Sequence, residues 1–505
     1  MRLQELYIKD YKVLKDFTIR FDEQSAITVL IGENGSGKST VLEAIAIIFN
    51  ELSLDLDGKL KEQPLIEYSV VYVIWNRSPI LNAPKGSEEI KQILVQLEYS
   101  YETGYKFLIN KQPISQPEFK RQHLFRSLIP SKIFLYYSGL STYLENLATG
   151  RNGLYSKELR SQKLNIGEYI YPKERLLYYI SPLHHAITLL CQLLADEDGN
   201  PTTLTGKEVK AEYELNEVKI VIQKTTKFKS SESYERFWGA EGALANLMQI
   251  LSLNTDLGRP DLPYGQQEKL DELTLSYTGL IGLRDIQYQN NLSNYEFAVV
   301  LFHLLESLFY EGYLAKVDLV FKRGHERLDY YRLSEGERHR YTILALAHLF
   351  NQSNEENNLF LLDEPDAYFH PRWQVKFIRA IQTEVNPFNQ YIMATHSPLL
   401  LNYADRRHVH VQQLVDGQAV DYMPRYAGRD IATVLYELMG VEERPEGVRT
   451  QLTKLFSLIE DENTVDARAL FAEIAAIIGH DDRDLTKAQA EIDFLEQLDE
   501  TNNEE

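Results

Sequence analysis

Cysteine is nearly absent from this sequence of 505 residues. The single cysteine, Cys191, lies in the apolar run AITLLCQLLAD, a pattern typical of the buried face of a helix. With one cysteine the chain cannot form an internal disulfide, and a cluster of thiolate metal ligands is excluded as well. We expect Cys191 to be a core thiol rather than a reactive one.

Long apolar runs are missing too. No run reaches the roughly 20 residues that a membrane-spanning helix requires, so no membrane partner is expected. Residues 1–21 alternate apolar and polar positions as a strand does, and they lack the apolar segment of a secretory signal. Because 44% of the residues are apolar and 25% are charged, we expect a cytoplasmic globular protein, long enough for two or three domains.

Basic residues are fewer than acidic ones, 53 against 74, which gives a formal net charge of −21. Such a charge opposes indiscriminate binding to nucleic acid or to anionic membranes. Two basic clusters, residues 120–126 and 151–163, still offer a local path for nucleic acid, although basic turns are usually only solvated. Nucleic acid therefore stays open as a partner, either directly or through a complex.

What the sequence does contain is a glycine-rich turn between an expected strand and an expected helix. The stretch GENGSGKS, Gly32–Ser39, matches the phosphate-loop pattern G-x-x-x-x-G-K-[ST] in that context. Its glycines let the backbone turn N–H groups toward phosphates, and Lys38 adds a full positive charge at the β- and γ-phosphates. Ser39 is expected to ligate Mg²⁺. The expected ATP-binding residues of this loop are Gly32, Asn34, Gly35, Ser36, Gly37, Lys38, Ser39 and Thr40.

Two adjacent carboxylates, Asp363 and Glu364, end a short apolar run that has the length of a buried parallel strand. We expect Asp363 to hold Mg²⁺ together with Ser39, and Glu364 to polarise the attacking water as a general base. A second such run precedes His396, whose imidazole can then reach the γ-phosphate or the water. A helix cap is the alternative for the two acids, and a structural role is the usual one for a lone histidine. The expected catalytic residues are Lys38, Glu364 and His396.

The stretch LSEGE, Leu333–Glu337, resembles the signature motif of ABC-type ATPases. The order of the motifs resembles the RecF/SMC-like branch of AAA-family ATPases, which includes the overcoming-lysogenisation-defect ATPases. The resemblance implies an α/β fold: an ABC-ATPase-type P-loop nucleotide-binding domain with an antiparallel β lobe, an inserted helical domain and a helical C-terminal extension. It implies that Ser334 and Gly336, just before a helix that begins near Glu337, approach the γ-phosphate held by Lys38 of a second copy. One chain alone is then expected to bind ATP and Mg²⁺ but to hydrolyse ATP poorly.

The sequence departs from this family in three respects. No glutamine closely follows the strand expected at 131–140, where the Q-loop belongs, and Tyr11 and Lys12 are the candidates for contacting adenine. No long heptad pattern predicts an SMC-like coiled-coil arm. The Toprim nuclease of the overcoming-lysogenisation-defect proteins has no counterpart, because the acids at 481–484 precede a helical stripe and suit a helix N-terminus. We therefore expect no nuclease in this chain.

The segments 426–445 and 467–496 resemble the C-terminal region of PtuA-like ATPases of Septu-type anti-phage defence. Those proteins work with a separate HNH nuclease, alone or inside retron systems. The resemblance implies an ATPase that forms a homodimer or higher homo-oligomer around ATP and regulates a partner nuclease in bacterial defence. Two alternatives are a RecF-like repair ATPase that clamps duplex DNA and a nucleotide-gated scaffold with little turnover. Salt-dependent DNA binding distinguishes the first, and measured turnover distinguishes the second.

The pattern of expected elements divides the chain into four parts. Strands between residues 65 and 140 look like an antiparallel addition to an α/β core, and helical patterns then dominate, apart from a strand at 217–224. The expected parts are the N-terminal part of the ATPase domain at 1–171, the inserted helical domain at 172–312, the C-terminal part of the ATPase domain at 313–430 and the helical extension at 431–505.

Three amphipathic stripes mark the helical extension, with Leu455, Ile474 and Ile492 among their apolar residues. Such stripes can pack on the body of the protein, on each other or on a partner. Packing is the more common role, and docking of a nuclease partner is the functional alternative.

Overall fold

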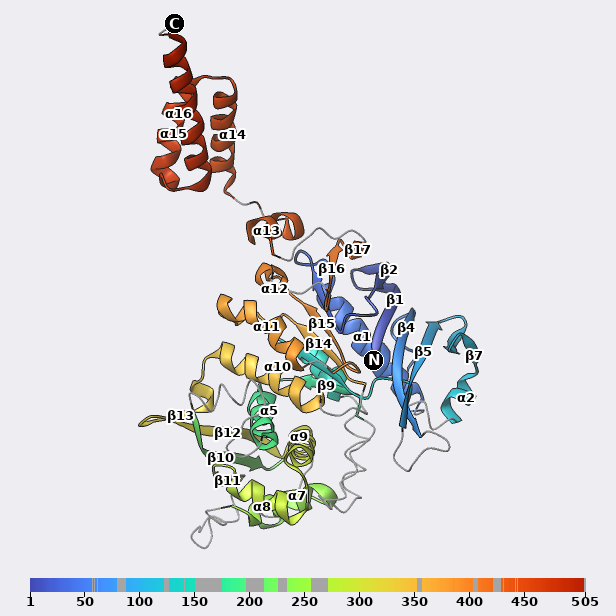
Figure 1. Ribbon diagram of the computed structural model, residues 1–505. Helices are drawn as coiled ribbons and strands as arrows, with labels where there is room; N and C mark the ends of the chain where they lie inside the picture. The colour runs from blue at the N-terminus through green and yellow to red at the C-terminus, as the bar shows by residue number, and fades with distance from the viewer. Residues whose placement is uncertain are drawn as a thin grey trace. The chain divides into compact units, whose positions relative to one another are not determined.

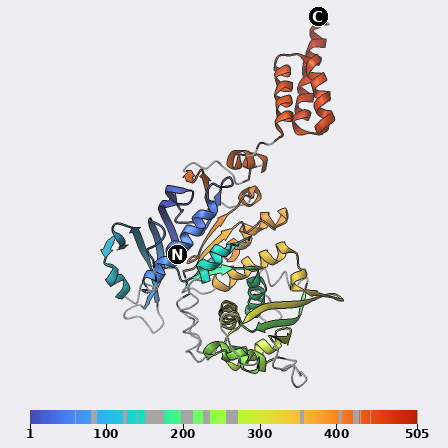
Figure 2. The same cartoon turned by 180° about the vertical axis from the view of Figure 1, so that it is seen from behind.

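A seven-stranded sheet forms the centre of the fold in the computed structural model (Figures 1 and 2). Its strands run in the order β17-β16-β3-β15-β14-β8-β9, and neighbours are parallel except that β17 is antiparallel to β16. The strands are β3 Ile27–Ile31, β8 Ile133–Tyr137, β9 Leu177–Ile180, β14 Leu359–Asp363, β15 Gln390–Ala394, β16 Val409–Val415 and β17 Gln418–Val420. Every residue of β3, β14 and β15 is buried, as is usual for parallel strands covered on both faces. The two apolar runs predicted to be buried parallel strands are confirmed as β14 and β15.

The structure describes residues 1–56, 58, 60, 62–79, 88–121, 127–139, 141–149, 175–196, 213–225, 234–255, 271–351, 357–384, 386–402, 407–420, 428–429, 431–440, 442 and 444–503. The chain forms two compact units, Met1–Arg429 and Asp430–Glu505. The basic cluster at 151–163 and most of the one at 120–126 lie outside the described residues. Within the described part of the chain, no helix is long and apolar enough to cross a membrane. The four-part division expected from the sequence stays a prediction.

Helices cover both faces of the parallel sheet. On one face, α1, Lys38–Leu56, packs against β14 and β15, and Val41 on this helix shares a core with Leu361. On the other face, the ring of Phe350 in α10, Glu335–Asn351, lies 4.5 Å from the ring of Phe134 in β8. The other helices near this sheet and the adjoining lobe are α2 Gln116–Arg121, α3 Thr142–Thr149, α11 Pro371–Glu384 and α12 Pro398–Asn402.

An antiparallel six-stranded sheet, in the order β2-β1-β4-β5-β6-β7, forms the predicted β lobe. Its strands are β1 Arg2–Tyr11, β2 Leu14–Arg20, β4 Tyr68–Pro79, β5 Glu88–Ser100, β6 Gly104–Ile109 and β7 Gln112–Ile114. The sequence pattern also assigned the strand at 131–140 to this lobe, and that assignment was wrong. This strand is β8, which pairs in parallel with β14 in the central sheet. Its first four residues are all buried, which suits an interior strand better than a lobe with one solvated face.

The stretch 172–312 contains more strands than its mainly helical pattern predicted. Besides the helices, it contains β9 and β11, and the strand predicted at 217–224 is confirmed as β10. β10 and β11 form a four-stranded antiparallel sheet with β12 and β13, which follow this stretch, in the order β11-β10-β12-β13. The strands are β10 Glu214–Gln223, β11 Glu272–Thr278, β12 Leu314–Arg323 and β13 Glu326–Asp329. The helices are α5 Pro182–Ala195, α7 Gly242–Leu253, α8 Ile281–Gln289 and α9 Asn294–Tyr310, with 3₁₀ turns η3 Tyr234–Gly239 and η5 Tyr330–Arg332. Cys191 is buried in α5, as predicted, and burial raises the pKa of its thiol.

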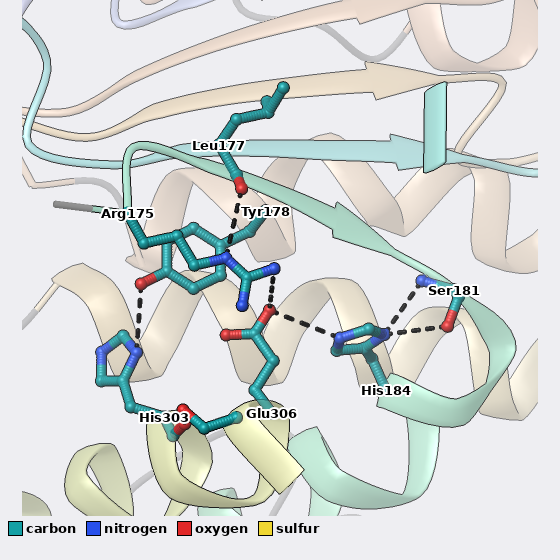
Figure 3. A network of polar contacts seen from close by, with 8 residues as sticks. Arg175, Leu177, Tyr178, Ser181, His184, His303 and Glu306 are labelled. Carbon is teal, nitrogen blue, oxygen red and sulfur yellow. Dashed lines mark hydrogen bonds and ion pairs between the residues drawn. The ribbon is translucent and has the colours of Figure 1, made fainter. Parts of the chain in front are cut away.

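A buried polar network joins β9, α5 and α9 within this unit (Figure 3). The Arg175 guanidinium, Nη2, lies 3.2 Å from Oε1 of Glu306 and stacks over the ring of Tyr310 at 3.6 Å. The backbone N–H of Ser181 donates to Nδ1 of His184 over 3.1 Å, so Nδ1 is an acceptor. In the neutral imidazole the proton is then on Nε2, which lies 3.6 Å from Glu306. Arg175 and Glu306 are only 7% and 1% exposed, so they form a charge pair almost without solvent that ties the start of β9 to α9. His184 links α5 to the same carboxylate.

The second unit contains α13 Ile431–Met439 and three longer helices, α14 Glu446–Glu460, α15 Thr464–Ile478 and α16 Arg483–Asn503. Leu455, Ile474 and Ile492 have no exposed surface and form the core between these three helices. The expectation that the stripes pack on each other is confirmed. Their buried side chains are not accessible to a partner, and docking of a nuclease on the helices around them stays a prediction. The acids at 481–484 lie at the start of α16, as predicted, where Arg444 contacts Asp482 over 2.9 Å.

Candidate nucleotide-binding site

The phosphate loop connects β3 to α1, so the first helical N–H groups point into the loop. Gly32 and Gly37 have φ angles of +150° and +104°, which side chains of L-residues rarely adopt. A Cβ on Gly32 would lie 2.2 Å from the carbonyl oxygen of Leu414, and one on Gly37 would lie 2.9 Å from Leu14. The loop therefore cannot keep this path with other residues at these two positions. Asn34, Gly35 and Ser39 are exposed, Thr40 is half-buried and Ser36 is buried.

Lys38 lies at the centre of this loop and is only 5% exposed. Its Nζ donates to the carbonyl oxygens of Gly32 and Glu33, each over 2.9 Å, and a third N–H of the ammonium can serve a phosphate oxygen. Burial lowers the pKa of Lys38, and the carboxylates of Asp363 and Glu364 oppose that shift. The buried Oγ of Ser36 has no hydrogen-bond partner among the described residues, so this loop also fits an anionic ligand. The residues present therefore suit the phosphates of a nucleotide.

Asp363, the last residue of β14, meets the first turn of α1. The Oγ of Ser39 donates to its Oδ1 over 3.0 Å, which brings together the two residues predicted to hold a metal. Hydroxyl and carboxylate oxygens are the ligands that Mg²⁺ prefers, so the pair fits this ion. Burial raises the pKa of Asp363 to about 6, with a smaller contribution from Glu364 in the same direction.

Replacing Asp363 with asparagine is expected to stabilise the ligand-free protein at pH 8. The pKa of Asp363 is about 6 when folded and about 4 when unfolded. The stability that the folded state gains from the protonated carboxyl of Asp363 is therefore complete below about pH 4 and is lost as the pH rises through about 6. Asparagine keeps an oxygen for Ser39 without a charge, so the free energy of unfolding at pH 8 should rise by at most about 3 kcal/mol.

Chemical denaturation of this variant at pH 8 and at pH 4 measures the effect, and the gain should disappear at pH 4. The matched control is Asp481→Asn, which removes an exposed carboxylate in the other unit and should change stability by under about 0.5 kcal/mol. An equal gain at both pH values would show that ionisation of Asp363 is not its origin.

Glu364 and His396 face each other at the ends of neighbouring strands. The Nε2 of His396 lies 3.7 Å from Oε1 of Glu364, and both side chains are partly exposed. Burial lowers the pKa of His396, as does the positive charge of Lys38, so the imidazole is mainly neutral at pH 7. Glu364 has a φ of +48°, a rare backbone conformation for this residue type, and its N–H donates to the carbonyl of Ala394 over 2.9 Å. Such strain is most often kept where it places a functional side chain.

The LSEGE turn caps α10, which begins at Glu335, two residues earlier than predicted. The Oγ and backbone N–H of Ser334 donate to Glu337, and the N–H of Glu337 donates back to Ser334. This reciprocal arrangement is a capping box, and it moves Gly336 into the first helical turn. A Cβ on Gly336 would lie 2.5 Å from the carbonyl oxygen of Tyr368. None of the recorded contacts among the described residues joins Ser334 or Gly336 to the phosphate loop.

The loop after β8 lies beside Asp363, where a Q-loop is expected. The N–H of Ser138 donates to the carbonyl oxygen of Asp363 over 3.2 Å. Both adenine candidates contact α1: Tyr11 donates to Glu43 over 2.6 Å, and Lys12 lies 2.6 Å from the same carboxylate. Their contact with adenine stays a prediction.

Asp366 and Thr395 lie beside the predicted catalytic groups, and neither was predicted as a site residue from the sequence. The Oγ1 of Thr395 donates to Oδ1 of Asp366 over 2.8 Å, and both side chains are buried. Their closeness in sequence to Glu364 and His396 was the available signal. It gave no indication that the two residues bond to each other.

Comparisons with known proteins identify two family models and two curated relatives that resemble this chain. A family model described as "AAA ATPase domain" matches residues 1–233, and one described as "AAA domain, putative AbiEii toxin, Type IV TA system" matches residues 207–402. The Retron Ec83 probable ATPase of Escherichia coli is 23% identical over 514 residues, covering 98% of this chain and 87% of the relative. The Retron Vc95 probable ATPase of Vibrio cholerae serotype O1 biovar El Tor is 23% identical over 433 residues, covering 79% and 71%.

A solved structure, the SMC head domain from Thermotoga maritima, is 15% identical and covers 83% of this chain and 97% of its own, with a TM-score of 0.32. A score this low supports no conclusion about function. The narrower resemblance to Septu-type PtuA proteins is not confirmed by these matches and stays a prediction.

Proposed function

We propose that this chain is an ABC-type AAA ATPase of the RecF/SMC kind, which closes around ATP as a homodimer and controls a separate nuclease in bacterial anti-phage defence; the matches to AAA ATPase models and to a retron probable ATPase support this. The observation that carries the proposal is the meeting of two pairs at one edge of the parallel sheet. Ser39 contacts Asp363 over 3.0 Å, and Glu364 lies 3.7 Å from His396. One pair suits a metal-bound nucleotide, and the other suits activation of water.

Hydrolysis of ATP to ADP and phosphate follows from the roles that these groups can take. Lys38 binds the phosphates from within the loop, while Ser39 and Asp363 would hold Mg²⁺, which when bound neutralises charge on the phosphates. Glu364 takes a proton from the attacking water, since its carboxylate is partly exposed beside the loop. The neutral imidazole of His396 keeps one N–H to donate to the γ-phosphate or the water.

Dimerisation is proposed because the signature turn is separate from the phosphate loop of its own chain. Ser334 is exposed, and its recorded hydrogen bonds stay within α10 and its cap. The N-terminus of a helix attracts anions, so this exposed cap suits the γ-phosphate of a nucleotide bound to a second copy. Each ATP then contacts Lys38 of one chain and Ser334 of the other.

Mixing two inactive variants tests this arrangement. Ser334→Arg blocks the signature turn, and Lys38→Ala removes the phosphate-binding charge, so each homodimer should lack turnover. A mixed dimer keeps one site with both groups intact, and random mixing should restore up to about one quarter of the wild-type rate. Steady-state phosphate release measures this rate. Subunits that exchange without any gain over either parent would show that the sites are either intramolecular or obligatorily coupled, and would contradict independent composite sites.

A separate nuclease is proposed because this chain has phosphate-, metal- and water-binding candidates for ATP but no predicted nuclease of its own, and because the sequence resembles PtuA-like ATPases that work with one. The relatives named above are retron probable ATPases, which fits a role in defence. ATP can bias the state of a partner only if that partner binds the open and closed dimers differently. The purified chain alone should therefore leave DNA intact with Mg²⁺ or Mn²⁺, and a co-expressed nuclease should bind it and respond to ATP. Metal-dependent cleavage of DNA by the isolated chain would contradict this part of the proposal.

A further inference from the structure

A closed ring of hydrogen bonds lies next to the catalytic pair. The Oγ1 of Thr395 donates to Oδ1 of Asp366 over 2.8 Å and accepts from the N–H of Ser397 over 3.0 Å. The Oγ of Ser397 donates to Oε1 of Gln374 over 3.1 Å, and Nε2 of Gln374 donates to the carbonyl oxygen of Asp366 over 3.3 Å. The ring thus joins the loop after β14, the loop after β15 and the first turns of α11.

Three of the four members of the ring are shielded from water, and Gln374 is half-buried, which restricts the geometry of the ring. Asp366, Thr395 and Ser397 are all buried, with Thr395 at 0% exposure. Inside a protein, hydrogen bonds are stronger than in water, and a buried group that loses its partner costs about 1–3 kcal/mol. Each member of the ring therefore resists a shift of the others.

His396 stands between two members of this ring, Thr395 and Ser397. The backbone on both sides of the imidazole is therefore fixed by bonds that end on Asp366. Asp366 in turn follows Glu364 by two residues, and the N–H of Glu364 donates to the residue before Thr395, Ala394, over 2.9 Å. The ring and this backbone bond together determine where the imidazole and the carboxylate of the catalytic pair stand.

We infer that Asp366 is a positioning residue for ATP hydrolysis, which acts through the hydroxyl of Thr395 to hold His396 against Glu364. The inference rests on the proposed function, because it assigns to His396 a role in hydrolysis. For this role the side chain at position 366 must accept a hydrogen bond at Oδ1, but it need not carry a negative charge. Asparagine can therefore replace Asp366, whereas alanine cannot.

The experiment compares Asp366→Ala with Asp366→Asn in the full-length chain, under the conditions in which the wild type hydrolyses ATP. Asp366→Ala should lower kcat by about 10-fold, because a small misplacement of a catalytic group has effects of this size, while KM for ATP stays within about twofold. Asp366→Asn should keep kcat within about threefold of the wild type. Thr395→Val and Thr395→Ser form a second pair with the same expected contrast, and melting temperatures verify that each variant is folded.

A double variant separates positioning from a general structural effect. If Asp366 acts through His396, Asp366→Ala should lower kcat no further in a His396→Ala background. An additional 10-fold loss in that background would overturn the inference, as would equal losses for Asp366→Ala and Asp366→Asn.

A readout without turnover keeps the inference distinct from the proposed function. NMR titration of the His396 imidazole, assigned with a His396→Gln variant, should show its pKa closer to 6.5 in Asp366→Ala than in the wild type, because the imidazole leaves its partly buried place. An unchanged titration in Asp366→Ala would overturn the inference. A wild-type protein without turnover, in contrast, would contradict the proposed function and leave the titration to decide the positioning role.

Discussion

Glu364→Gln is expected to lower the ATP turnover of this protein by about 100-fold or more, while its affinity for ATP stays within a few-fold of the wild type. Glutamine has nearly the shape of glutamate but does not accept a proton from water at neutral pH. The contacts of the phosphate loop do not involve this side chain: Lys38 donates to Gly32 and Glu33, and Ser39 donates to Asp363. The closed dimer should therefore accumulate with ATP, which gel filtration and phosphate release measure together.

Lys38→Ala is the matched control, because it removes the charge that the phosphates need before any chemistry. This variant should neither bind ATP tightly nor dimerise with it. Elution of Glu364→Gln as a monomer with ATP, like Lys38→Ala, would count against the sandwich of two chains. A turnover of Glu364→Gln near that of the wild type would instead remove Glu364 from the role of general base, and negligible turnover of the wild type would favour a nucleotide-gated scaffold.

The second large effect is expected on stability, from the buried pair of Arg175 and Glu306. Their side chains are only 7% and 1% exposed, with Nη2 and Oε1 3.2 Å apart. Glu306→Ala leaves the guanidinium buried without its carboxylate, which typically destabilises a protein by about 3–5 kcal/mol. Chemical denaturation, followed by a signal from the unit Met1–Arg429, measures the loss.

The double variant Arg175→Met, Glu306→Leu is the control for this second prediction. Two apolar side chains of similar volume leave no buried charge, so much of the lost stability should return. If the double variant were as unstable as Glu306→Ala, packing around the pair rather than charge compensation would explain the effect. His184, which lies 3.6 Å from Glu306, loses this neighbour in the double variant as well. We therefore expect the stability to recover only in part.

Local motifs were predictable because consecutive residues encode them. The phosphate loop requires glycines at fixed spacing, and β14 and β15 are continuous apolar runs that end at Asp363 and Ala394. The placement of β8 was not predictable in the same way, since an apolar run of five residues suits either a parallel sheet or the inner face of an antiparallel lobe. Pairing with β14, more than 200 residues later, decides between them.

Contacts between residues far apart in the sequence could not be predicted, for the same physical reason. Arg175 and Glu306, and likewise Asp366 and Thr395, meet because the topology brings separate elements together. Amphipathic stripes show a related limit: the spacing around Leu455 predicts which face of a helix is buried but does not say against what. The capping box at Ser334 is a local S-x-x-E pattern that points to a helix start at Glu335, but the sequence prediction placed that start near Glu337.

Gly336 lies so close to the carbonyl oxygen of Tyr368 that the start of α10 and the loop after Glu364 are in direct contact. Tyr368 follows Glu364 by four residues, and its ring stacks on His339 of α10 at 4.4 Å. In the proposed dimer, Glu364 serves the nucleotide bound by its own chain, whereas the cap of α10 serves the other nucleotide. A shift of the loop when one γ-phosphate is lost should therefore displace the helix whose cap contacts the second. For the proposed dimer we accordingly expect the two hydrolysis events to be mechanically coupled, with cooperative rather than independent turnovers.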